Sequence, residues 1–390
     1  MLSSVLTYFL LHASLCLGAP SVLGGRPSAF DVAVEKRAPH VDPFNNLVVF
    51  DPPSDYIVPR TLYARTMLQS DQQTIYATWE NYSPEGGDNP LVYFPIYKST
   101  DLGKTWEHIS NVTDQVMGWG LRYQPFLYEL REDIGDYEAG TILLSGSAIP
   151  TNLSNTQIEL YASRDQGYTW EFVSHIAAGG VAKPNNGETP VWEPFLLTWN
   201  HQLVVYYSDQ RDPAHGQKIV HQVSSDLVNW GDVVDDVAYD VYDDRPGMPI
   251  IAALPNGQFI YTYEWYGAPE GGFAVYYKLS DDPLNWISAK EYLVHTSDGT
   301  HPTGSPTVTW TPYPEGSNGT IVVSGSNYKG VFLNTQLGAP GSNWEYRDTA
   351  SPNQYTRFVM AMPEAGQIMI AGGGVLNGEN NDVSVSVIQL

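Results

Sequence analysis

One turn motif recurs along this chain and favours a repeat architecture. The sequence SRDQGYTW occupies residues 163–170, and STDLGKTW, which shares its Ser-x-Asp-x-Gly-x-Thr-Trp pattern, occupies residues 99–106. Shorter copies of the motif end at Trp230, Trp286 and Trp344. The five tryptophans that end these copies are 64, 60, 56 and 58 residues apart. A nearly constant period of this length indicates one supersecondary unit per period.

Each component of this motif, the Asp box, has a local structural role. Asp and Ser side chains bond nearby backbone N–H groups and close a turn. Gly adopts a positive φ without steric cost, and Trp anchors the turn by burying a large apolar surface. We therefore expect the Asp boxes to be structural turns on the outer rim of the fold, without a catalytic role.

A second repeat lies between the boxes. In each copy of this repeat, an apolar strand begins at a residue that is usually polar and is often followed by Pro. A strand tolerates proline at its start but not in its middle. The first residues of these strands are Arg60, Gln124, Glu193, Met248, Ser305 and Arg357. Six four-stranded units of this kind predict an all-β fold, a six-bladed β-propeller with Asp-box (BNR-type) repeats around a central channel.

The two ends of the chain complete this predicted ring. The last unit has no Asp box, so its outer strand must come from elsewhere, and we expect residues 47–50 to supply it. The alternating sequence at residues 383–388 is typical of a strand that would pair with them. This pairing would remove free sheet edges. The alternative of two β-sandwich domains lacks a linker near the middle of the chain.

The N-terminal region has the pattern of a processed leader. Residues 5–17 are apolar but too few to span a bilayer, small residues follow them, and a Lys-Arg pair stands at residues 36–37. The alternative is a chance Lys-Arg pair in an N-terminal arm. We expect a secreted, extracellular protein with this organisation: a signal peptide over 1–19, a propeptide over 20–37, and a single catalytic propeller domain over 38–390.

The composition is typical of a secreted β protein. The only cysteine, Cys16, lies in the leader, so packing and sheet closure must stabilise the mature chain without a disulfide. A net charge of −24 argues against binding to nucleic acid or to an anionic membrane. Glycosylation sequons begin at Asn81, Asn111, Asn152 and Asn318. We expect a glycoprotein that acts as a monomer on a carbohydrate substrate.

Two glutamates are the candidate catalytic residues. In a propeller, functional groups gather where innermost strands begin and second strands end, on one face of the channel. Glu193 begins the innermost strand of the third unit, and Glu264 ends the second strand of the fourth, so adjacent blades bring them together. Aromatic residues flank both: Trp192 lies beside Glu193, and Tyr263, Trp265 and Tyr266 lie beside Glu264. Such residues stack on sugars and raise a carboxyl pKa, and glycoside hydrolysis needs two facing carboxyl groups. The alternative is two blade-tip carboxylates satisfied by backbone N–H groups or arginine.

The residues around these glutamates resemble those of glycoside hydrolase family 93. The resemblance is carried by VWEPF at residues 191–195, YEWYG at 263–267, the two complete Asp boxes and the Lys-Arg leader, and it covers essentially the whole mature chain. It implies a retaining exo-glycosidase that hydrolyses linear α-1,5-L-arabinan from the non-reducing end and releases mainly arabinobiose. By this resemblance Glu193 is the nucleophile and Glu264 the acid/base.

Further residues near the predicted channel mouth are candidates for substrate binding. They are Arg60, Arg65, Trp192, Asp209, Arg211, Arg245, Tyr263, Trp265, Tyr355 and Arg357. For each polar residue the alternative is an ion pair that stiffens a blade tip. No His, Cys and Asp cluster has metal-ligand spacing and no glycine-rich phosphate loop opens a helix, so we expect neither a metal nor a cofactor.

Two other functions stay open at the level of sequence. A sialidase-like exo-glycosidase needs an arginine cluster, for which Arg60, Arg245 and Arg357 are candidates, but its Tyr–Glu pair and Asp acid have no clear counterpart here. A non-catalytic carbohydrate-binding propeller would use the same aromatic residues without catalysis. Release of reducing sugar from debranched arabinan, compared with release of sialic acid, separates these functions.

Overall fold

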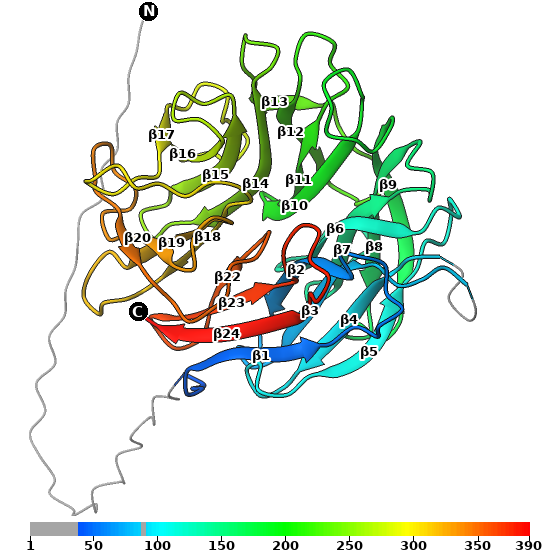
Figure 1. The fold of residues 1–390 in the computed structure, drawn as a ribbon, viewed down its shortest axis with the longest axis horizontal. Helices are drawn as coiled ribbons and strands as arrows, with labels where there is room; N and C mark the ends of the chain where they lie inside the picture. Colours follow the sequence, from blue (N-terminus) through cyan, green and yellow to red (C-terminus); the bar gives the residue numbers. More distant parts are fainter. Residues whose placement is uncertain (1–37, 87–90) are drawn as a thin grey trace, which may run out of the picture. The chain divides into compact units, whose positions relative to one another are not determined.

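The computed structural model describes residues 38–86 and 91–390. Their strands form six four-stranded antiparallel sheets that follow one another around a centre (Figure 1). All six sheets belong to the unit Ala38–Leu390. The predicted all-β fold with six blades is therefore confirmed. The signal peptide and propeptide predicted over residues 1–37 lie outside the described residues.

Four consecutive strands make each of the first five blades, with the innermost strand first. Blade one contains β2 (Thr61–Leu68), β3 (Ile75–Asn81), β4 (Phe94–Ser99) and β5 (Glu107–Val112). Blade two contains β6 (Leu121–Glu129), β7 (Ile142–Ala148), β8 (Thr156–Ser163) and β9 (Glu171–Gly179). Blade three contains β10 (Val191–Trp199), β11 (Gln202–Asp209), β12 (Lys218–Ser224) and β13 (Val234–Val237).

The last three blades follow the same plan, except that blade six draws on both ends of the chain. Blade four contains β14 (Arg245–Ala253), β15 (Phe259–Tyr266), β16 (Phe273–Ser280) and β17 (Glu291–Leu293). Blade five contains β18 (Thr307–Thr311), β19 (Thr320–Ser324), β20 (Val331–Asn334) and β21 (Glu345–Arg347). Blade six contains β22 (Phe358–Ala361), β23 (Gln367–Gly372), β24 (Val383–Gln389) and β1 (Phe44–Phe50).

The N-terminal strand closes the ring as predicted. Strand β1 pairs with β24, so that Leu47 lies opposite Val385 and Val48 lies opposite Ser384 (Figure 1). Strand β24 also pairs with β23 on its other side. The C-terminal strand thus has partners on both edges, which removes a free edge that other chains could join.

A residue with positive φ lies at the start of each of the first five innermost strands. These residues are Tyr63 (φ 53°), Gln124 (φ 54°), Glu193 (φ 65°), Met248 (φ 57°) and Ser305 (φ 47°). The first four lie at irregularities in strand pairing, where a bulge turns a side chain to a new direction. In blade one the equivalent residue is therefore Tyr63, three residues beyond Arg60, although β2 itself begins at Thr61, directly after the predicted start.

The two complete Asp boxes form the same turn between the third and fourth strands of a blade. The Thr169 N–H and hydroxyl donate to the Asp165 carboxylate at 2.8 and 2.7 Å, and the Gly167 N–H donates to the Ser163 hydroxyl at 2.8 Å. The box at residues 99–106 repeats these bonds at 2.9, 2.7 and 2.8 Å. The Ser, Asp and Thr side chains of the motif are thus engaged within their own turn, which agrees with a structural role.

Side chains fill the centre of the ring. The rings of Phe126 and Phe195 lie 4.9 Å apart, and Phe126 lies 6.3 Å from Phe358. The Arg65 guanidinium is 3.7 Å from the ring of Tyr63 and 5.1 Å from that of Phe358, and this arginine is only 2% exposed. The centre is therefore a packed core with one buried cation.

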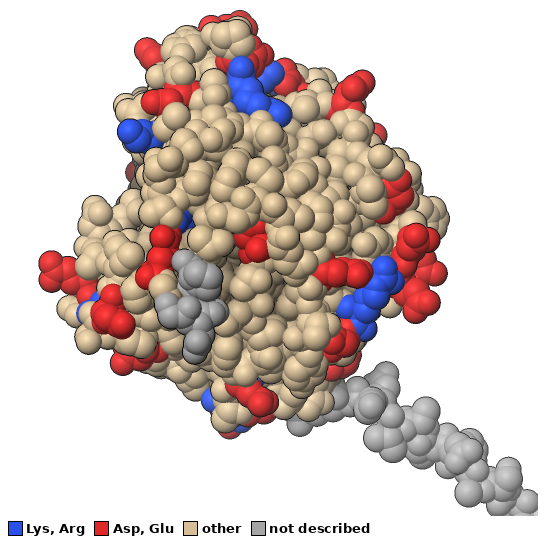
Figure 2. Space-filling view, turned by 90° about the vertical axis from the view of Figure 1, so that its right-hand side faces the viewer, with Lys and Arg blue, Asp and Glu red and all other residues tan. Residues whose placement is uncertain are grey.

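The charged side chains on the surface are mainly acidic, in line with the net charge of −24. Figure 2 shows acidic side chains spread over the face it draws, with basic ones in only a few places. Among the sequon asparagines, Asn152 and Asn318 are exposed, whereas Asn81 is only 4% exposed. Within residues 38–86 and 91–390, no helix has the length and apolar character needed to cross a membrane.

Candidate active site

The two candidate catalytic glutamates line one cavity at the channel mouth. This cavity has a volume of about 350 Å³ and walls from blades three to six. Its lining includes Trp192, Glu193, Gln217, Arg245, Glu264, Phe273, Ser305 and Tyr355. An adjoining cavity of about 250 Å³ shares Trp192, Glu193 and Tyr355 and adds Glu80, Tyr82 and Gln124. A larger cavity of about 480 Å³ between blades five and six lacks a facing pair of carboxyl groups.

Glu193 is held at a bulge in β10 and fixed by its neighbours. Its Oε2 accepts hydrogen bonds from the Ser208 hydroxyl at 2.6 Å and from the Met248 N–H at 2.9 Å. Strand β14 approaches closely because residue 247 is glycine. A Cβ added there would lie 2.6 Å from the Gln217 Nε2 and 3.3 Å from the Glu193 Oε2. The sequence of β14 thus leaves room for the carboxylate.

Glu264 occupies the solvent end of β15, opposite Gly247 in the register with β14. Its Oε2 accepts a hydrogen bond from the Ser305 N–H at 2.6 Å. Ser305 is the positive-φ residue of the next blade, as Met248 is for Glu193. Each carboxylate is therefore tied to the positive-φ residue of the blade that follows its own, which fixes the position of both groups.

Different surroundings separate the proton affinities of the two glutamates. Burial, together with the nearby charge of Glu193, raises the pKa of Glu264 to about 8. Burial also raises the pKa of Glu193, but two hydrogen-bond donors and the charges of Arg245 and Arg65 oppose this rise. Glu264 therefore tends to keep its proton, as an acid requires, while the donors and cations around Glu193 act to stabilise its ionised form, as a nucleophile requires.

A third carboxylate, Glu80, belongs to the adjoining cavity and was missing from the predicted site. It ends β3 as Glu264 ends β15, and it accepts a hydrogen bond from the Gln124 N–H at 3.0 Å and from the Tyr82 hydroxyl at 2.7 Å. Burial raises the pKa of Glu80 to about 7. The sequence carried a signal for it, because Thr-Trp-Glu at residues 78–80 matches Thr-Tyr-Glu at residues 262–264.

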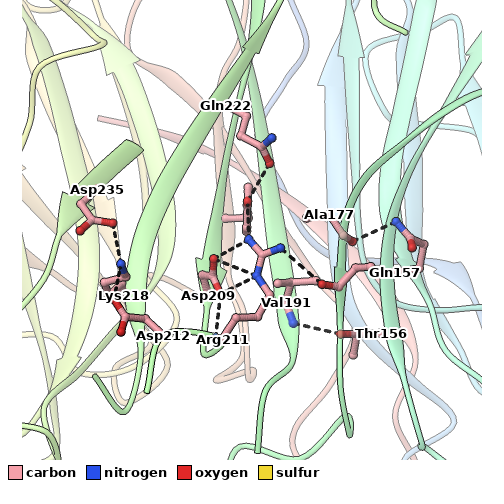
Figure 3. A network of polar contacts seen from close by, with 12 residues as sticks. Thr156, Gln157, Ala177, Val191, Asp209, Arg211, Asp212, Lys218, Gln222 and Asp235 are labelled. Atoms are coloured by element: carbon pink, nitrogen blue, oxygen red, sulfur yellow. Dashed lines mark hydrogen bonds and ion pairs between the residues drawn. The ribbon is translucent and has the colours of Figure 1, made fainter. Parts of the chain in front are cut away.

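Asp209 and Arg211 do not reach the cavity, contrary to the predicted sugar contact. Arg211 donates to both carboxylate oxygens of Asp209, at 2.9 and 2.6 Å, and to the Tyr207 hydroxyl at 3.0 Å (Figure 3). Neither residue lines either cavity at the channel mouth. The reason is strand alternation: Ser208, which contacts Glu193, and Asp209 point to opposite faces of β11.

Alternation also turns two predicted aromatic contacts away from the cavity. The Tyr263 hydroxyl donates to Glu291 at 2.7 Å, and Trp265 stacks on Tyr239 with ring centroids 4.0 Å apart. Both residues neighbour Glu264 in sequence and therefore lie on the other face of β15. The aromatic wall beside Glu264 comes instead from Phe273 and Tyr355.

Three predicted arginines also lie outside the cavity lining. Arg357 is fully buried and donates to the carbonyl oxygens of Tyr328 and Gly330, at 3.1 and 2.6 Å. These hydrogen bonds link blade six to blade five. Arg65 lies in the packed centre, and Arg60 precedes the bulge of β2. Of the predicted binding residues, those that the structure brings to the cavity with both glutamates are Trp192, Arg245 and Tyr355.

Arg245 is the cation at the cavity wall. Its guanidinium donates to the side-chain oxygens of Gln210 and Gln217 at 3.0 and 3.1 Å, and to the carbonyl of Pro184. In the described ranges 38–86 and 91–390, no cluster of three or more His, Cys, Asp or Glu residues could hold a metal ion.

Solved structures provide the informative comparisons with known proteins. No protein-family model matches the chain, and no curated protein matches it. The α-L-arabinanase of Penicillium chrysogenum, solved with arabinobiose, shares 53% identity over 90% of this chain and 99% of its own, with a TM-score of 0.86. The family 93 (GH93) α-L-arabinofuranosidase of Fusarium graminearum, also solved with arabinobiose, shares 51% identity over 89% and 98%, with a TM-score of 0.86.

More distant structures share the fold alone. The NanB sialidase of Streptococcus pneumoniae is 11% identical over 88% of this chain and 70% of its own, with a TM-score of 0.56. At that identity the likeness is one of blade architecture and carries no information about substrate. The high-identity neighbours, in contrast, match this chain over nearly their whole length.

Proposed function

This chain belongs to glycoside hydrolase family 93, and from that premise we propose that it is a retaining exo-α-1,5-L-arabinanase. It would hydrolyse linear arabinan from the non-reducing end and release mainly arabinobiose. The observation that carries this proposal is the shared cavity lined by Glu193 and Glu264, in which Glu193 accepts two hydrogen bonds and lies near Arg245 while burial raises the pKa of Glu264 to about 8. Two relatives with more than half of their residues identical were solved with arabinobiose, which supports the choice of substrate.

In the first step, Glu193 acts as the nucleophile and Glu264 as the acid. The Glu193 Oε1 accepts no hydrogen bond from the described residues and is free to attack the anomeric carbon, while the bonded Oε2 is held by Ser208 and Met248. Glu264 gives its proton to the glycosidic oxygen as that bond breaks. The product is an ester between Glu193 and the sugar, together with the shortened arabinan.

In the second step, the roles of the two side chains reverse. Ionised Glu264 removes a proton from water, the resulting hydroxide adds to the anomeric carbon, and Glu193 leaves as a carboxylate. Two inversions give net retention. Exo-action and a disaccharide product are supported by the adjoining cavity, where Glu80 and Tyr82 offer hydrogen-bonding groups to a second sugar unit.

The test is product chromatography on debranched linear arabinan. We expect arabinobiose as the main product from the earliest times. A ladder of long oligomers at early times would contradict exo-action, and no release of reducing sugar would contradict the function itself. Sialyllactose serves as the control substrate, because release of sialic acid would support the sialidase alternative.

We further propose that the enzyme is secreted as a monomer after removal of a signal peptide and of a propeptide that ends at the Lys-Arg pair. The sequence pattern of residues 1–37 and the exposure of the sequon residues Asn152 and Asn318 support this proposal. N-terminal sequencing of protein from the culture medium should begin at Ala38. A start at Ala19 or Pro20 would show that the Lys-Arg pair is not cut, and size-exclusion chromatography would detect a dimer.

A further inference from the structure

An exposed aromatic pair stands at the rim of the cavity. Tyr266 and Phe273 are 48% and 42% exposed, and their ring centroids are 4.9 Å apart with an interplanar angle of 38°. The two residues lie directly opposite each other in the register of β15 and β16. Phe273 also lines the cavity that contains both glutamates. Exposed apolar groups beside a catalytic cavity indicate a binding surface.

The pair continues the strand face that carries Glu264. Side chains alternate along a strand, so Tyr266, two residues beyond Glu264, projects on the same face of β15 but closer to solvent. Phe273 shares that face because it is the direct cross-strand partner of Tyr266. The aromatic surface therefore begins next to the carboxyl group of Glu264 and extends outward from it.

Contacts on both sides hold this surface in place. The Phe273 carbonyl accepts a hydrogen bond from the Gly304 N–H at 2.8 Å, which ties β16 to the segment that leads to Ser305. Glu270 lies in the turn between the two strands and accepts a hydrogen bond at 2.7 Å from the hydroxyl of Tyr276 in β16. A surface fixed before binding loses little conformational entropy when a ligand arrives.

We propose that Tyr266 and Phe273 form a stacking platform for the arabinosyl units on the leaving-group side of the scissile bond. This proposal rests on the proposed function. An acid that protonates the glycosidic oxygen must face the sugar that leaves, so the departing polymer extends from the Glu264 side of the cavity. The aromatic faces next to Glu264 on that side belong to this pair, and they are uncharged, which suits a neutral polysaccharide.

The test compares substrates from arabinotriose to arabinohexaose, which differ only in the number of units beyond the scissile bond. In the unmodified enzyme, kcat/KM should rise with chain length. In Tyr266→Ala and Phe273→Ala this rise should flatten. We expect kcat/KM on arabinohexaose to fall by about tenfold, which corresponds to a lost stacking contact of about 1.4 kcal/mol. The loss on arabinotriose should be smaller. Tyr266→Phe and Phe273→Tyr keep the aromatic faces and should preserve the rise.

A matched control is Tyr168→Ala, which removes a tyrosine that is 53% exposed on an Asp-box turn instead of the cavity rim. It should not change the chain-length dependence. If the alanine variants fold poorly, Tyr266→Leu and Phe273→Leu keep apolar bulk without a ring and should give the same flattening. An equal loss on every substrate, or no loss, would overturn the platform. An unmodified enzyme that is inactive on every chain length would instead overturn the proposed function.

Discussion

The proposed mechanism gives Glu193 and Glu264 different roles, and their surroundings differ as well. Glu193 has two hydrogen-bond donors on one oxygen and a cation nearby, whereas Glu264 has a single backbone donor and a like charge beside it. Glu193→Gln and Glu264→Gln should each lower kcat by about a thousandfold or more while circular dichroism stays unchanged, because each removes one half of the pair.

Azide distinguishes the two roles. In Glu264→Ala, azide should attack the glycosyl-enzyme intermediate and give a glycosyl azide of retained configuration. In Glu193→Ala, azide should replace the nucleophile and give the inverted configuration. Product stereochemistry by NMR decides the matter, and the reverse pattern would exchange the two assignments.

Gly247 sets how closely β14 approaches Glu193. An added Cβ would lie 2.6 Å from the Gln217 Nε2, a distance at which a neighbour must shift, and 3.3 Å from the Glu193 Oε2. Gly247→Ala should therefore lower kcat at least about tenfold by displacing the catalytic carboxylate, since small misplacements carry large kinetic costs.

The matched control for this substitution is Gly231→Ala, where the nearest atoms to an added Cβ are at ordinary contact distances of 3.5 and 3.6 Å. It should leave kcat unchanged. If Gly247→Ala also keeps full kcat, then the close approach of β14 does not position Glu193.

Residue patterns predicted which strand ends would meet, but not every side-chain direction. Glu193 and Glu264 were found because both follow a repeat that can be counted along the chain. Tyr263 and Trp265 were included because they neighbour Glu264 in sequence, although a period of two places them on the other face. Phe273 was missed because only the register of β15 and β16 brings it beside Tyr266.

At the scale of strands, the repeat located the innermost strands of all six blades but missed the position of the bulge in blade one. Blade one carries the bulge at Tyr63, which Ala64 follows instead of proline, so sequence offered no marker for it. The bulge is a feature of backbone pairing, and a positive φ at a non-glycine residue is visible only in coordinates. The predicted pairing of the chain ends succeeded because one unit lacked an outer strand.

Strand β24 is the element on which ring closure depends. It pairs with both β23 and β1, and Val383, Val385 and Val387 are each at most 1% exposed. Deleting residues 383–390 should abolish cooperative thermal unfolding, because it leaves two unpaired edges and exposes the neighbouring core. Deleting only Leu390 is the control and should lower Tm slightly. Cooperative unfolding of the longer deletion near the original Tm would contradict closure by β24.

On the scale of the whole molecule, acidic residues outnumber basic ones, 43 to 19, and several of the acidic groups are buried. Burial raises the pKa of Glu80 and Glu159 to about 7, and that of Asp236 to about 6. Together with Glu264, these carboxyls come from four different strands or loops. Only two of them lie at the channel mouth, so the effect extends beyond catalysis.

These raised pKa values set the direction in which stability changes with pH. A carboxyl whose folded pKa exceeds its unfolded value binds more protons when folded, so its contribution to stability is complete below about pH 4 and is lost as pH rises through the folded pKa. Within its window each such group weakens the fold by about 1.4 kcal/mol per pH unit. The opposite case is Asp226, where hydrogen bonds from Asn229 lower the pKa and stabilise the fold above pH 4.

The protein should therefore be most stable near pH 4 to 5, with a Tm that falls steadily as pH rises toward 8. Repulsion within a chain of formal net charge −24 acts in the same direction. Differential scanning calorimetry across this range gives the measurement. Glu159→Gln is the decisive variant, because Glu159 is fully buried and lines neither channel-mouth cavity. That variant should show a shallower decline between pH 5 and 7. A Tm that rises from pH 5 to 8 would mean that the buried carboxyls are ionised in the folded state without cost.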